Sequence, residues 1–179
     1  MNFCSSCGAP VTIQVPEGDH LPRHVCSACR TIHYVNPKIL VGAVPVWGDR
    51  ILLCRRAIMP REGYWTMPSG FMENGETLQM GAARETYEES LARVTIEDLL
   101  SVINIAGHNQ VHVLFRARMN GPEHGATLES SEVRLFSEHE VPWDDLAFRT
   151  VTHTLRHFFE DRCKGERGLH LVDLDTTRI

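Results

Sequence analysis

The stretch GFMENGETLQMGAARETYEES, residues 70–90, decides the fold of this chain because two glycines are followed by several closely spaced acidic residues. Glu85 precedes Glu88 by three residues and Glu89 by four, so a helix would carry all three carboxylates on one face. Their mutual repulsion requires a counter-charge, and oxygen-rich sites of this kind suit magnesium or manganese. Gly70 and Gly75 allow the preceding loop to turn sharply and to approach the helix closely. The stretch therefore predicts a site for a divalent metal ion.

A helix is predicted over residues 78–90, because no proline interrupts this segment and Thr77 is a suitable N-cap. The loop would bring Glu76 back toward the acidic face, where Arg84 can pair with one of the acids and hold it in place. A solvated acidic helix would account for any single carboxylate. It explains neither the glycines nor the spacing.

Composition limits the other possibilities. With 179 residues, 42% of them hydrophobic and 23% charged, the chain can bury one ordinary core and has room for one small appendage. A net charge of -5 and a pI near 6.0 argue against a nucleic acid or an anionic membrane as partner, since both usually require a basic excess. No run approaches the length of a membrane span, and the first residues do not resemble a signal peptide. We therefore expect a cytoplasmic protein that has no membrane partner.

Four of the six cysteines form two Cys-x-x-Cys pairs, Cys4 with Cys7 and Cys26 with Cys29. Each pair can form a tight turn that directs two thiolates at one tetrahedral zinc ion. Four thiolates fill the coordination sphere, so this zinc would be structural, and its binding would supply most of the folding energy of a short segment. Two independent redox pairs or surface thiols are the alternative.

The remaining segments predict a mixed sheet between helical layers. Residues 38–47 and 50–56 are rich in β-formers and are separated by Gly48-Asp49, which indicates a hairpin. Further strands are expected near residues 94–105, 111–119 and 133–136, and a closing helix near residues 146–163. The fold class is therefore α/β (α+β).

Gly70, Glu76 and the run RETYEES from Arg84 to Ser90 resemble the box of the Nudix hydrolases, and GYWTMPSG resembles the lead-in to that box. The resemblance implies that the helix glutamates bind Mg²⁺ or Mn²⁺ and that Glu76 and Arg84 support them. One position departs from the pattern. Leu91 stands where the family usually has glycine, and because leucine resists the left-handed conformation of a helix cap, we expect a different helix end.

The resemblance divides the chain into a zinc ribbon (1–35), a Nudix hydrolase domain (36–165) and a C-terminal tail (166–179). A Cys4 ribbon before such a domain resembles two groups, the NADH pyrophosphatases and the ADP-ribose/FAD pyrophosphatases. The SQPWPFP-type motif of the first group does not occur, and the segments after the box look more like the second group.

Further site residues are predicted outside the helix. Glu132 is a candidate general base, although a simple loop acid is an equally good interpretation. Arg55 and Arg56 are candidates for pairing with substrate phosphates, with a solvated strand end as the alternative, and Trp65 is a candidate for base stacking, with a core position as the alternative. The predicted catalytic residues are Arg84, Glu88, Glu89 and Glu132, and the predicted Mg²⁺ or Mn²⁺ ligands are Glu76, Glu85, Glu88 and Glu89.

These residues predict metal-dependent hydrolysis of the diphosphate bond of a nucleoside diphosphate derivative, with ADP-ribose or FAD as substrate and AMP as product. The alternatives are an NADH pyrophosphatase and a non-catalytic Nudix-like module whose ribbon binds nucleic acid or protein. The partner would be a small nucleotide substrate, and a homodimer is compatible with the sequence.

Overall fold

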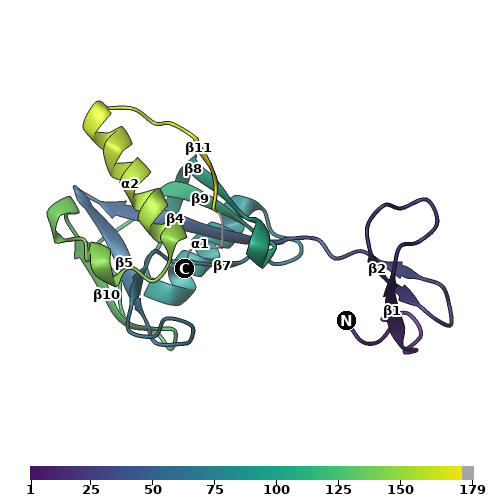
Figure 1. Ribbon diagram of the computed structural model, residues 1–179. Coiled ribbons are helices and arrows are strands. Elements are labelled where there is room, and N and C mark those ends of the chain that lie inside the picture. The colour runs from purple at the N-terminus through teal and green to yellow at the C-terminus, as the bar shows by residue number, and fades with distance from the viewer. Residues whose placement is uncertain (175–179) are drawn as a thin grey trace. The chain divides into compact units, whose positions relative to one another are not determined.

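The computed structural model describes residues 1–174 and divides the chain into two units, Met1–Pro37 and Lys38–Ile179, each of which is described here by itself (Figure 1). The prediction placed this boundary after residue 35. No described helix is both long enough and apolar enough to cross a membrane.

The first unit is a small antiparallel sheet. Its strands are β1 (Val11–Gln14), β2 (Arg23–Cys26) and β3 (Ile32–His33), and β2 pairs with both neighbours. Only Cys4, Val25 and Cys26 are buried among its residues. Three buried side chains make a core that is small for an independently stable fold.

The second unit is built on one mixed sheet with the strand order β10-β5-β4-β9-β8-β11. Two of the pairs, β4 with β9 and β8 with β11, are parallel, and the remaining pairs are antiparallel. The strands are β4 (Lys38–Trp47), β5 (Arg50–Arg56), β8 (Val94–Ile105), β9 (Gln110–Met119), β10 (Ser130–Phe136) and β11 (His170–Asp173), while β6 (Trp65–Thr66) and β7 (Ser69–Phe71) pair with β5 and β4.

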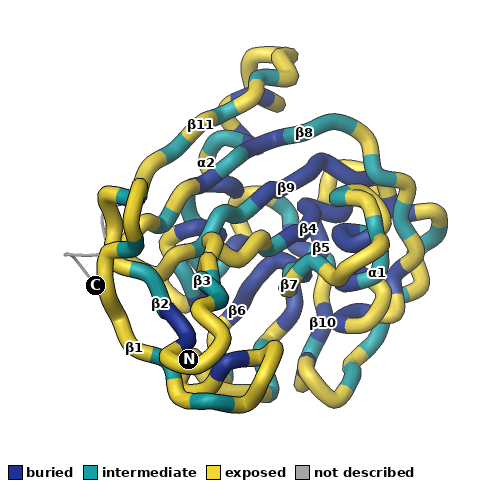
Figure 2. Tube along the Cα trace, turned by 90° about the vertical axis from the view of Figure 1, so that its right-hand side faces the viewer, coloured by how far each residue is buried: buried dark blue, intermediate teal, exposed yellow. Residues whose placement is uncertain are grey.

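Two helices, α1 (Leu78–Ser90) and α2 (Arg149–Lys164), cover opposite faces of this sheet (Figure 1). Val151, Leu155 and Phe158 recur at helical spacing along α2 and pack into the larger core cluster. Ala82 of α1 packs into a second cluster with Val41 and other residues of β4 and β9. The strands between the two clusters are buried on both faces, as Figure 2 shows for β4, β5 and β9. Three short 3₁₀ turns, Ala106–His108, Glu138–Glu140 and Trp143–Asp145, complete the unit.

The predicted mixed sheet between helices is confirmed. Strands β4 and β5 form the expected hairpin across Gly48, whose positive φ of 64° suits a glycine, and α1 has the predicted bounds. The short strands β6 and β7, within the predicted loop, were not anticipated. The segment predicted as a C-terminal tail differs from a free tail, because residues 170–173 form β11 and add a strand to the sheet. Its residues 175–179 lie outside the described part of the chain.

The end of α1 corrects one expectation. Leu91 adopts the left-handed conformation itself, with φ 59° and ψ 1°, and its N–H donates to the Tyr87 carbonyl. The helix therefore ends as a glycine-capped helix would, with leucine holding a backbone conformation that favours glycine.

Candidate active site

The acidic helix face lines a cleft of about 960 Å³ in the second unit. Residues of α1, β7, the start of β9, the start of α2 and the loop after β5 surround it. The lining includes five carboxylates, three of them from α1, and four guanidinium groups, from Arg56, Arg61, Arg84 and Arg149. A cleft with both kinds of charge can hold cations and the anionic groups that those cations bind.

Glycines bring the loop against the helix. A Cβ atom at Gly70 would lie 2.3 Å from a carboxyl oxygen of Glu85, so only glycine leaves room for that side chain. Gly75 turns the loop with a φ of 92°. Thr77 caps α1 by accepting a hydrogen bond from the Met80 N–H at 3.1 Å. Both the close approach at Gly70 and the sharp turn at Gly75 agree with the prediction.

Arg84 binds three glutamates at once. Its Nε and Nη2 donate to the two oxygens of Glu76 at 3.0 and 2.8 Å, and its Nη1 donates to Glu85 at 2.7 Å and to Glu88 at 2.9 Å. This forked contact lowers the pKa of Glu76 to about 2. The structure thus places Glu76 as a partner of Arg84 with both oxygens engaged, whereas Glu85 and Glu88 each contact Arg84 through one oxygen.

Glu89 is the most buried acid of the helix face. Its side chain accepts a hydrogen bond from the Ser69 N–H at 3.3 Å, and only 7% of the residue is exposed. Burial raises its pKa to about 8, and burial also raises the pKa of Glu85. A buried carboxyl group of this kind holds either a proton or a cation.

Glu129 joins the acidic wall, and sequence reasoning missed it. Its charge raises the pKa of Glu89 further, after the larger effects of burial and of Glu85, so these carboxylates share one electrostatic environment. Glu132 lies elsewhere. It pairs with Arg55 at 3.6 Å and with Arg134 at 3.9 Å, and it does not line the cleft.

The two acids hold different positions relative to β10, since Glu129 lies just before the strand and Glu132 lies within it, after a bulge. Ser130 pairs with Arg56 and Glu132 pairs with Arg55, so the register shifts between them. The spacing between Glu129 and Glu132 therefore cannot be counted as in a regular strand. The signal available in the sequence was a second glutamate just before the strand, in ESSEV.

The other predicted substrate contacts fall into different places. Arg56 lines the cleft, with its guanidinium 5.2 Å from the centre of the Phe148 ring and its Nε donating to the Pro60 carbonyl. Arg55 donates to the Gly63 carbonyl and lies outside the cleft lining. Trp65 is 7% exposed and stacks edge to face on Phe136 in the core, which removes it from the cleft.

The four cysteines of the first unit converge as their spacing predicted. Their sulfur atoms all lie within 4.8 Å of one another, with separations such as 3.7 Å for Cys4 and Cys29 and 3.4 Å for Cys7 and Cys26. Tetrahedral zinc with bonds of about 2.3 Å places sulfur atoms roughly 3.8 Å apart. His33 Nε2 lies 3.2 Å from Cys4 Sγ, where it supports a thiolate without adding a fifth ligand.

The other two cysteines are separate from this cluster. Cys54 is fully buried in β5, where its thiol faces the Glu89 carbonyl and burial raises its pKa. Cys163 is exposed on the last turn of α2.

The acidic wall fits a hard divalent cation by the chemistry of its donors, since carboxylate oxygens are the ligands that Mg²⁺ and Mn²⁺ prefer. The cradle that Gly70 opens for Glu85 also fits this role. Within residues 1–174, the cysteine cluster is the one group of three or more ligand atoms gathered within 4.8 Å. Arg84 pairs with two of the helix glutamates, Glu85 and Glu88.

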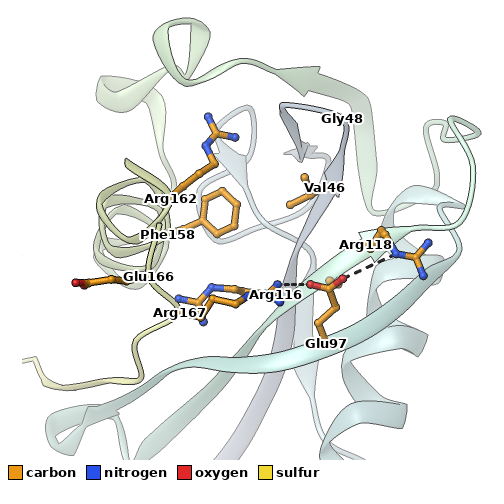
Figure 3. Close-up of a pocket in the computed structure, with 10 residues that line it drawn as sticks. Val46, Gly48, Glu97, Arg116, Arg118, Phe158, Arg162, Glu166 and Arg167 are labelled. Carbon is orange, nitrogen blue, oxygen red and sulfur yellow. Dashed lines mark hydrogen bonds and ion pairs between the residues drawn. The ribbon is translucent and has the colours of Figure 1, made fainter. Parts of the chain in front are cut away.

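A second cavity, of about 290 Å³, lies between the end of α2 and strands β4, β8 and β9 (Figure 3). The arginines that line this cavity form ion pairs with acidic side chains. The buried Arg116 pairs with Asp161 and with Asp98, and Arg167 pairs with Asp98 and Glu97. This ion-pair network ties α2 to β8 and to the segment before β11, so we assign the cavity a structural role.

Comparison with known proteins agrees with both units. A zinc-ribbon family model described as "Nudix N-terminal" matches residues 2–35 of the chain. A second family model, described as "NUDIX domain", matches residues 37–161. A crystal structure of a NUDIX hydrolase from Nitrosomonas europaea is 49% identical, with a TM-score of 0.96, over 98% of this chain and 100% of that chain.

Two curated relatives match the second unit in part. The NAD-capped RNA hydrolase NudC of Edwardsiella ictaluri is 38% identical over 94 residues, which are 51% of this chain and 34% of the relative. The ADP-ribose pyrophosphatase of Methanocaldococcus jannaschii is 26% identical over 113 residues, which are 61% of this chain and 67% of the relative. The chain thus spans about a third of the length of the NudC protein that it matches.

The loop-helix-loop, the acidic cleft, the ribbon and the family model over residues 37–161 lead to one conclusion: this chain belongs to the NUDIX family and is a Nudix hydrolase with an N-terminal zinc ribbon.

Proposed function

We propose that this hydrolase cleaves the diphosphate of a nucleoside diphosphate derivative, ADP-ribose or FAD, and releases AMP. The observation that carries the proposal is the composition of the cleft, in which five carboxylates share one cavity with Arg56 and Arg61. A diphosphate diester repels hydroxide, so its hydrolysis needs neutralised oxygens and a positioned water molecule. The cleft offers groups for both.

We propose Glu85, Glu88 and Glu89 as the residues that hold Mg²⁺ or Mn²⁺. Bound there, the cations polarise phosphoryl oxygens and lower the pKa of a water molecule. Arg84 positions Glu85 and Glu88 through the hydrogen bonds described above.

Glu129 is the proton acceptor in this proposal. Its side chain has no salt-bridge partner within residues 1–174, and it lines the cleft beside the three helix glutamates. Arg56 and Arg61 lie in the same cleft, where their guanidinium groups can bind the charge of the departing phosphate.

Two observations favour ADP-ribose and FAD. The relative from Methanocaldococcus jannaschii carries the name ADP-ribose pyrophosphatase, and this chain lacks the motif expected downstream of the box in NADH pyrophosphatases. The volume of the cleft, about 960 Å³, is within the range of small-molecule sites and accommodates a dinucleotide.

The test is a substrate panel of ADP-ribose, FAD and NADH with Mg²⁺ or Mn²⁺, read by the release of AMP. We expect ADP-ribose or FAD to have the highest kcat/KM, and we expect Glu88→Gln and Glu89→Gln each to reduce turnover at least about 100-fold, because each deletes a metal-binding charge at constant size. If both variants kept the wild-type rate at saturating Mg²⁺, the assignment of the helix glutamates as metal ligands would be wrong.

A second substrate class has its own support. The NudC relatives are named for hydrolysis of NAD-capped RNA, which also contains a diphosphate beside adenosine. If NADH or NAD-capped RNA is the best substrate in the panel, the ranking changes while the chemistry of the cleft stays the same.

A further inference from the structure

One part of the cleft is apolar and holds no acidic side chain of the metal site. In the sheet, Phe71 of β7 pairs with Leu40 of β4, and Leu40 pairs with His112 of β9. Residues paired across neighbouring strands project from the same face, so these three side chains form a row, and all three line the cleft. Phe71 is 48% exposed, which is unusual for a phenylalanine inside a domain. The row offers a flat ligand an apolar floor.

A hydrogen-bonded pair lies at the end of this row. His112 Nε2 and Gln110 Oε1 are 3.2 Å apart, and Gln110 is two residues before His112 on β9, so both side chains are on one face. Within residues 1–174, neither the other ring nitrogen of His112 nor the remaining amide group of Gln110 has a hydrogen-bond partner. Burial lowers the pKa of His112 to about 4, so its ring is neutral at pH 7.

The neutral pair always presents one donor and one acceptor. If His112 donates to Gln110, the imidazole keeps a bare nitrogen and the amide keeps its NH₂ group. If the amide is turned and donates to His112, the imidazole keeps an N–H and the amide keeps its oxygen. Adenine matches either arrangement, because its exocyclic amino group donates beside a ring nitrogen that accepts.

We propose that Leu40 and Phe71 form a nucleobase subsite in which the pair of Gln110 and His112 reads the edge of adenine. This inference rests on the proposed function and names the half of the substrate that carries specificity. Phe71 and the helix glutamates line the same cleft, so a base on Phe71 places its ribose and phosphates in the cavity that holds the acidic wall.

The test compares ADP-ribose with its analogue in which purine replaces adenine and the amino group is missing. We expect the wild type to prefer ADP-ribose about tenfold in kcat/KM, the value of one hydrogen bond left unmade. In Gln110→Leu/His112→Phe, we expect this ratio to fall to about 1, with most of the change in KM. The control Gln79→Leu, on the exposed face of α1, should keep the wild-type ratio. The double variant would overturn the subsite if it kept the tenfold preference while its circular dichroism matched the wild type.

Binding of AMP, measured by calorimetry, separates this inference from the proposed function. We expect the double variant to bind AMP about tenfold more weakly than the wild type and than Gln79→Leu. If no diphosphate is hydrolysed but AMP binding shows this loss, the subsite stands and the proposed reaction fails. If ADP-ribose is hydrolysed and AMP binding is equal in all three proteins, the reaction stands and the subsite fails.

Discussion

Leu91 closes the acidic helix in a backbone conformation that leucine adopts only at a cost. A residue with a Cβ atom loses about 1–2 kcal/mol in the left-handed region, and glycine does not. The N–H of residue 91 caps the Tyr87 carbonyl whichever residue stands there.

We predict that Leu91→Gly raises the free energy of unfolding by about 0.5–1 kcal/mol, since the relief of strain is partly offset by the larger entropy of glycine in the unfolded chain. Urea denaturation of the wild type, Leu91→Gly and Leu91→Ala measures the change. The alanine variant keeps the Cβ atom and should show no gain. A glycine variant less stable than the wild type would mean that the leucine side chain contributes more packing energy than its backbone conformation costs.

His112 gives a second prediction at this scale. Its pKa of about 4 lies below the value of 6.5 for a free histidine, so the unfolded chain takes up a proton first as the pH falls. The folded state therefore loses stability between about pH 6.5 and pH 4. We predict that His112→Gln removes this loss, which is on the order of 1 kcal/mol once screening by solvent is allowed for. The measurement is urea unfolding at pH 7 and pH 5, and parallel losses in both proteins would contradict it.

Local patterns identify some of these residues and not others. The helix glutamates and the zinc cysteines are visible in the sequence because helical periodicity and tight turns relate residues close in the chain. Phe71, Gln110 and His112 belong to three parts of the chain that only the sheet register joins. No local pattern contains that register.

At the scale of elements, Glu129 just before β10 lines the cleft, whereas Glu132 within β10 does not. We predict that Glu129→Gln lowers kcat at least about 100-fold, the usual contribution of a general base, whereas Glu132→Gln changes it less than about threefold. The two residues lie on either side of the bulge at the start of the strand, which makes them a matched pair. Steady-state hydrolysis of ADP-ribose with Mg²⁺ compares the two variants. If Glu132→Gln lost more activity than Glu129→Gln, Glu132 would be the general base.

Strong periodic elements were predictable, and short or distant ones were not. Strands β4, β5 and β8 and helix α1 follow from runs of apolar residues or from caps within the chain. Strands β6 and β7 have two and three residues, too few to show a period, and their hydrogen bonds come from β5 and β4. Strand β11 pairs in parallel with β8, with His170 opposite Ser101, so its partner lies far away in the sequence.

At the scale of the whole molecule, the two units carry separate candidate metal sites, the cysteine cluster and the acidic cleft. We predict that removal of zinc with a chelator, followed by dialysis into Mg²⁺, unfolds residues 1–37 and leaves most of the diphosphatase activity. The ribbon has three buried residues, whereas the second unit has its own clusters of buried side chains.

Hydrogen exchange measures this by region, and metal analysis confirms the loss of one zinc ion per chain. The variant Cys26→Ser allows the same experiment without a chelator, because it deletes one of the four proposed zinc ligands. Simultaneous loss of protection in both units would show that the second unit needs the ribbon in order to fold.

The distribution of thiols has a practical consequence. With zinc bound, four cysteines are engaged and Cys54 is shielded inside the sheet, which leaves Cys163 as the one reactive thiol of the native protein. A fluorophore attached there sits on the last turn of α2, the helix whose first turn borders the cleft. The wild-type chain can therefore be labelled at a single point without mutagenesis, and the appearance of additional labelled cysteines would count the ribbons that have lost their metal.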